Sequence, residues 1–159
     1  MSGFKLALPK VGESVAVHFD GTRDRLSIDP VGTESSTFVE EERCFEVLEL
    51  VSELVELPGA RSYDEALSSL REHKTGHFHF VGVCAIPGFM EKFDPTKDYG
   101  NVVIVFCGTK FSSREIGSFF LAIRPASVGW EFEFFADKVS FLLAITSETR
   151  VLYLVTNRP

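Results

Sequence analysis

The segment that most constrains the fold is the run VEEERCFEVLELVSELVEL, from Val39 to Leu57. Plotted on a helical wheel, its apolar side chains gather on one side and its glutamates on the other. This spacing predicts an amphipathic helix that Pro58 and Gly59 end. The helix would pack on the core through Cys44, Val47, Leu48, Val51, Leu54 and Val55.

The polar side of this predicted helix carries charges of one sign. Glutamates at helical i, i+4 spacing repel one another by roughly a few tenths of a kcal/mol each, and a helix selected only for solubility usually includes lysines. We therefore predict a docking face for a basic surface on a partner protein, with charge steering the encounter. The alternative interpretation is an ordinary solvated face. The predicted face consists of Glu42, Glu46, Glu49, Glu53 and Glu56.

The remaining sequence predicts one further helix and several strands. A capping box at Ser62 and Glu65 predicts a helix from Tyr63 to about His73. Residues 112–124 fit either a helix or a strand. Strand patterns occupy His77 to Ile86, Asn101 to Cys107, Trp130 to Phe135, Val139 to Thr146 and Val151 to Thr156, the last three forming an antiparallel meander.

Phenylalanine is unusually abundant, with 16 residues in a chain of 159. Its ring is large and has no polar group, so most of these side chains should lie in the core. We predict a single α+β domain spanning residues 1–159. Its sheet should be mainly antiparallel, strongly twisted or closed into a partial barrel, with about six to eight strands packed by two or three helices.

The segment between Pro87 and Gly100 has several turn-forming residues and no clear period. Loops of this length without regular structure are often functional. Phe89, Met90 and Phe93 lie in it, and we predict that they form an exposed apolar anchor for the partner protein.

The overall charge limits the classes of partner. The formal net charge is -7, which disfavours binding to nucleic acid and to anionic lipid. The chain has no apolar stretch long enough to span a membrane. Cys44, Cys84 and Cys107 are far apart and lie in apolar runs, which predicts buried thiols in a reducing compartment and hence a cytoplasmic protein.

Few residue patterns indicate chemistry. His77 and His79 would share one face of a strand, and with His73 nearby they could hold a metal ion, but we favour the interpretation that they occupy the solvent face of an edge strand. The run from Cys107 to Ser113 would bind an anion only if a helix began at Ser112. The sequence contains neither of the glycine-rich patterns that bind nucleotide phosphates, GxxxxGK[ST] and GxGxxG. We predict no catalytic residue, cofactor or metal.

These observations favour a non-enzymatic interaction domain, such as an inhibitor, an immunity-type protein or an adaptor, which binds a basic protein surface through its acidic helix. An alternative is a small-molecule-binding or hydrolytic α+β barrel, with an apolar aromatic cavity lined by the strands at 130–135 and 139–145. A third interpretation is a homo-oligomer whose second copy covers exposed phenylalanines.

Overall fold

The computed structural model describes residues 4–7, 37–42, 49–73, 78–95, 101–113, 117–127 and 129–157. The described strands are β1 (Phe4–Ala7), β2 (Thr37–Glu42), β3 (Glu49–Val55), β4 (His79–Phe80), β5 (Val102–Ser113), β6 (Gly117–Pro125), β7 (Trp130–Ala136) and β8 (Arg150–Thr156). The described helices are α1 (Tyr63–His73), α2 (Ile86–Lys92), α4 (Val139–Thr146) and the short 3-10 helix η1 (Val83–Ala85).

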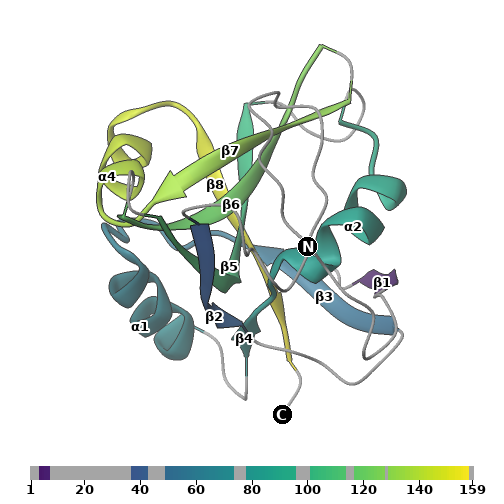
Figure 1. Cartoon of the computed structure of the whole chain (residues 1–159), viewed down its shortest axis with the longest axis horizontal. Coiled ribbons are helices and arrows are strands. Elements are labelled where there is room, and N and C mark those ends of the chain that lie inside the picture. The colour runs from purple at the N-terminus through teal and green to yellow at the C-terminus, as the bar shows by residue number, and fades with distance from the viewer. Residues whose placement is uncertain are drawn as a thin grey trace.

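These strands form one 8-stranded sheet in the order β1-β3-β8-β5-β6-β7, with β2 paired to β5 and β4 paired to β8 (Figure 1). The pairs are antiparallel except for β5 and β8, which are parallel at the centre of the sheet. The predicted α+β class with a mainly antiparallel sheet is confirmed. The predicted meander of the last three segments is wrong, because β8 returns to the middle of the sheet and pairs with β3 and β5.

The long strand β5 bends in its middle, where the chain after β4 crosses it. The backbone N–H of Gly108 donates to the carbonyl of Val81 at 3.1 Å. A Cβ atom at Gly108 would lie 2.4 Å from the backbone nitrogen of Gly82, so only glycine fits this crossing. The pairing register of β5 with β6 shifts between Phe106 and Phe111. A register shift of this kind increases the local twist of a strand.

The sheet separates two apolar clusters, and helices cover both faces (Figure 1). One face packs against α2, the other against α1 and α4. Phenylalanine fills both clusters, as predicted. The buried rings are Phe80, Phe89, Phe106, Phe111, Phe119, Phe120, Phe135 and Phe141.

The predicted amphipathic helix from Val39 to Leu57 is wrong. Residues 37–42 and 49–55 are strands β2 and β3, and residues 43–48 lie outside the described part of the chain. Leu50, Ser52 and Leu54 are all buried, which is the two-residue repeat of a strand. As a strand, β3 forms backbone hydrogen bonds with β1 on one side and β8 on the other. As a helix, the same segment would hold its glutamates at i, i+4 spacing, where like charges repel one another.

Two other predicted elements need correction. The apolar run Val139–Thr146 is helix α4 and not a strand. The segment 77–86 contributes only the two-residue strand β4 before η1 and α2 begin. The segment 112–124, which the sequence left open, is strand at 112–113 and 117–124, and residues 114–116 are outside the described part.

Helix α1 is confirmed with its predicted start. The backbone N–H of Glu65 donates to the hydroxyl oxygen of Ser62 at 3.3 Å, and the Glu65 carboxylate accepts from the backbone N–H of Arg61 at 3.0 Å. The pattern is that of a capping box, except that the Glu65 carboxylate bonds the backbone N–H of Arg61 and not that of Ser62. Ala66 and Leu70 bury the inner side of α1 against the sheet.

A candidate docking surface on helix α4

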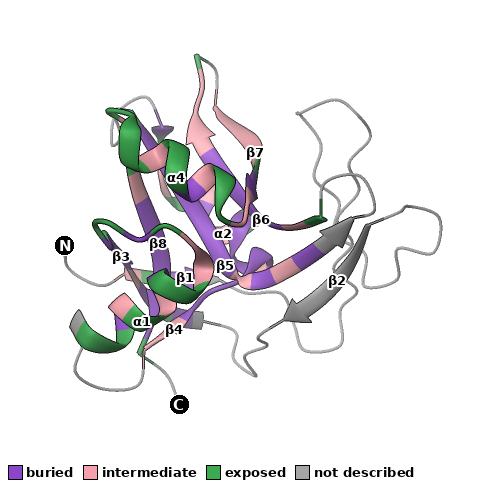
Figure 2. Ribbon diagram, turned by 90° about the vertical axis from the view of Figure 1, so that its left-hand side faces the viewer, coloured by how far each residue is buried: buried purple, intermediate pink, exposed green. Residues whose placement is uncertain are grey.

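Helix α4 presents its apolar side chains to solvent. Among them, Val139 is 61% exposed, Leu142 49%, Leu143 64% and Ile145 46%. Figure 2 shows exposed residues along most of this helix, which lies with α1 on the same side of the sheet. No charged residue occurs between Val139 and Thr146. Contiguous exposed apolar side chains of this kind mark interaction surfaces in soluble proteins.

A single buried side chain anchors α4. Phe141 is 1% exposed, and its ring lies edge-on to Phe135 of β7 with 4.8 Å between ring centroids. It also lies 6.2 Å from the ring of Tyr153 on β8. Val139, Leu142, Leu143 and Thr146 follow the i, i+3, i+4, i+7 spacing of one helical stripe, which is opposite to Phe141 on the helix. We call these four residues the α4 stripe.

An open groove of about 250 Å³ lies beside α4, between this helix and the connection from β3 to α1. Its floor includes the buried side chains of Leu57, Phe141 and Tyr153. At its rim, the Arg150 guanidinium forms an ion pair with the Glu56 carboxylate. The groove is apolar below and charged at the edge, so it suits an apolar side chain flanked by polar groups.

The titratable groups beneath α4 are neutral at physiological pH. Burial raises the pKa of the Cys107 thiol well above its ordinary value, and the nearby Asp137 carboxylate raises it further. Burial likewise raises the pKa of the Tyr153 hydroxyl, with a smaller contribution from Cys107. A thiol that stays protonated is a poor nucleophile, so Cys107 serves as a small apolar core residue.

The predicted acidic face does not form a single stripe. Glu42 lies on β2, which pairs with β5, whereas Glu49 and Glu53 lie on β3, between β1 and β8. Glu56 follows β3 and is paired with Arg150. Glu46 lies outside the described residues. The argument for an acidic docking helix therefore loses its structural basis.

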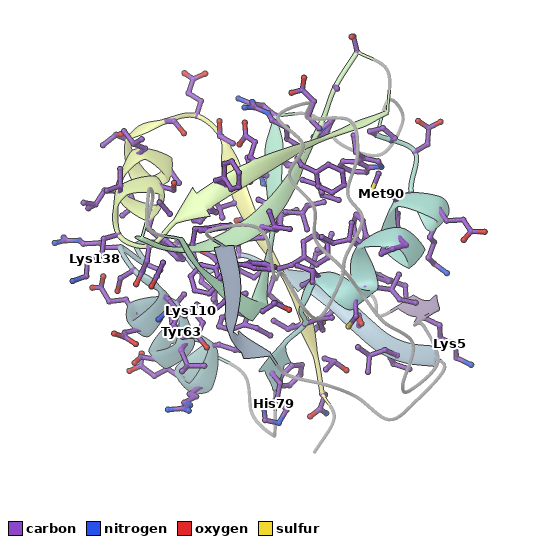
Figure 3. All side chains as sticks on the ribbon, viewed as in Figure 1. Lys5, Tyr63, His79, Met90, Lys110 and Lys138 are labelled. Atoms are coloured by element: carbon purple, nitrogen blue, oxygen red, sulfur yellow. The ribbon has the colours of Figure 1, made fainter. Side chains whose placement is uncertain are left out.

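The predicted exposed anchor is also wrong. Phe89 is buried in helix α2, where its ring packs at 4.7 Å from Phe93 and 6.0 Å from Phe106. Met90 and Phe93 are partly buried against the same cluster, and Figure 3 labels Met90 at the α2 side of the molecule. Residues 87–92 of the predicted loop belong to helix α2, which has Pro87 in its first turn, and residues 96–100 lie outside the described part of the chain.

The histidine and anion-site hypotheses gain no support. His79 lies on β4 at one end of the molecule (Figure 3), and His77 is outside the described residues. Within the described residues, no group of three or more potential ligands could hold a metal ion. The run from Cys107 to Ser113 continues strand β5, so no helix begins there to bind an anion.

The sequence pattern of Val139–Thr146 favours a strand, so it does not predict the exposed surface of α4. An uncharged run of eight residues next to a turn at Asp137 and Lys138 was the available signal. Periodicity alone cannot separate a buried strand from a short apolar helix of this length.

No family model, no curated protein and no solved structure matches this chain. In the part of the chain that the structure describes, no helix is both long enough and apolar enough to cross a membrane.

Proposed function

We propose that this chain is a non-enzymatic protein-interaction domain and that it docks through the α4 stripe and the adjoining groove. One observation carries the proposal: a helix without charges holds to the core through Phe141 and leaves Val139, Leu142 and Leu143 in water. Fully burying a leucine contributes about 1.5–3 kcal/mol, so covering side chains that are half to two thirds exposed is worth about 1 kcal/mol each.

The groove gives this surface a place for an anchoring side chain. Binding energy at interfaces concentrates where a few apolar side chains enter desolvated pockets surrounded by polar groups. The buried floor of Leu57 and Tyr153 and the Glu56–Arg150 ion pair at the rim have this arrangement. A partner that covers the α4 stripe would place one apolar side chain in the groove.

The chemistry of the surface favours a protein over a lipid or a nucleic acid. Helices that bind membrane surfaces flank their apolar side with lysine and arginine. The α4 stripe is flanked by Lys138 at one end and Glu148 at the other, in a chain with a net charge of -7. Cys84 and Cys107 are present as thiols, which supports action in a reducing compartment such as the cytoplasm.

The small-molecule alternative has less support. The groove beside α4 is open to solvent, and so is a second groove of about 320 Å³ along α1, which is lined by polar side chains such as Asp64 and Glu72. The aromatic strand β7, which was expected to line a cavity, contributes to neither groove.

A tagged chain used as bait tests the proposal. The wild-type bait should retain a partner protein, which includes an untagged copy of the chain, and Leu143→Glu should lose it, because the added charge would be buried in the interface. Val51→Glu is the matched control, since Val51 is 58% exposed on strand β3 and belongs neither to the α4 stripe nor to the lining of the groove. The proposal is overturned if wild type retains nothing, or if Leu143→Glu and Val51→Glu retain the partner equally.

A further inference from the structure

The charges at the two ends of α4 are placed against the helix dipole. Lys138 is the residue before the first turn, where the helix end is partially positive, and Glu148 follows the last turn, where it is partially negative. Figure 3 shows Lys138 extending away from the molecule. Neither side chain forms an ion pair with another residue of the described chain. Both charges are therefore unfavourable in the isolated molecule.

A second α4 running antiparallel to the first removes this conflict. Two-fold symmetry brings the N-terminal end of each helix to the C-terminal end of the other. Lys138 of one copy then lies near Glu148 and the partially negative helix end of the second copy, and the same contact occurs twice. The charges that disfavour the single helix thus complement each other in the pair.

The α4 stripe suits a partner identical to itself. Its side chains are apolar except for Thr146, whose hydroxyl donates to the carbonyl of Leu143 at 3.0 Å and so needs no partner across an interface. Residues spaced at i, i+3, i+4 and i+7 interlock between antiparallel helices. Since no charge occurs within the stripe, two copies can approach without repulsion at the contact itself.

The size of the surface sets the strength of such a pair. A helix of 8 residues is about 12 Å long and covers only the centre of an interface, since a stable contact buries about 800 Å² on each partner. Helix α1 lies on the same side of the sheet and carries charges of both signs, among them Asp64, Glu65, Arg71 and Glu72, which suits a polar rim.

We infer that the occupant of the α4 stripe is a second copy of this chain, bound as a two-fold dimer with antiparallel α4 helices and paired Lys138 and Glu148. This inference rests on the proposed function, because it names the partner of the same surface. The dimer is reversible, with the α4 stripe as its apolar centre and α1 at its rim.

Sedimentation equilibrium of the purified full chain tests the inference, because only a second copy is present to bind. We expect a species of twice 17.7 kDa at tens of micromolar, with Leu143→Glu monomeric and Val51→Glu still dimeric. Circular dichroism of each variant shows whether the fold is retained. A wild type that stays monomeric up to roughly millimolar concentration overturns the inference, while a partner retained by the bait would leave the proposed function intact.

Charge exchange tests the antiparallel arrangement separately. Lys138→Glu and Glu148→Lys should each weaken dimerisation at least about tenfold, because each places like charges opposite one another twice. Each change improves the match to the dipole of the isolated helix, so loss of dimer cannot be attributed to loss of α4. The double variant should restore dimerisation to within about threefold of wild type. Single variants that dimerise like wild type, or a double variant as weak as the single ones, would exclude this geometry.

Discussion

Two buried groups on neighbouring strands make the stability of the fold sensitive to alkaline pH. Cys107 on β5 and Tyr153 on β8 belong to the same apolar cluster, beneath α1 and α4. In the folded state the pKa of each lies above its ordinary value, 9.0 for the thiol and 10.0 for the phenol. Desolvation is the main cause for both, because the charged forms would lose water without gaining a partner.

The free energy of unfolding should therefore fall as the pH rises above 9. The unfolded chain releases these protons near their ordinary pKa values while the folded chain keeps them, so the full stability is present below pH 9 and is lost above it. Each group contributes a slope of up to about 1.4 kcal/mol per pH unit. Urea unfolding at a series of pH values measures this slope.

Cys107→Ala provides the comparison for the thiol. This variant should be less stable at neutral pH because it leaves a small cavity, but its stability should change less between pH 9 and pH 10 than that of wild type. If the free energy of unfolding changes equally with pH in the two proteins, the pKa of the Cys107 thiol is the same in the folded and the unfolded chain.

At the scale of the elements, α4 depends on one side chain for its position. Phe141→Ala should lower the free energy of unfolding by about 3–5 kcal/mol, because it removes the anchor that contacts Phe135 and Tyr153. Leu143→Ala should change it by less than about 0.5 kcal/mol, since that side chain is 64% exposed. Chemical denaturation at a concentration low enough to exclude dimers measures both. Similar losses in the two variants would mean that α4 packs differently.

The elements that were predicted correctly carry local signals. Ser62 and Glu65 cap α1, Trp130 to Phe135 alternates between aromatic residues and glutamate except at its end, and Val102 to Cys107 is a continuous apolar run in a central strand. The cap and the alternation are each specific to one kind of element, and the β-branched residues of the apolar run favour a strand over a helix.

The errors arose where a local pattern fits two structures. Leu50 and Leu54 are four residues apart, and residues at this spacing share a face in a helix and in a strand alike. The buried Ser52 between them distinguishes the two, but its burial depends on pairing with β1 and β8, which are distant in the sequence. The exposure of α4 was equally beyond local prediction, because it depends on what the rest of the chain leaves uncovered.

At the scale of the whole molecule, the sheet is most protected at its centre. Strands β5 and β8 form its parallel pair, and buried residues occupy both of their faces. Their amides should exchange hydrogen only when the whole chain unfolds. Helix α4 lies at the periphery with one fully buried side chain, so it should open at a lower free energy than the sheet.

Because α4 should open at a lower free energy than the central strands, its hydrogen exchange can report whether docking stabilises it. Hydrogen exchange of α4 should slow at least about tenfold when the chain is concentrated into the dimer range, because docking stabilises the helix that forms the interface. Exchange at β5 and β8 should serve as the internal reference for global stability. Leu143→Glu should remove the concentration dependence at α4 while Val51→Glu retains it. Concentration-independent exchange at α4 in a protein that is shown to dimerise would place the interface elsewhere, since a helix buried between two copies cannot open without separating them.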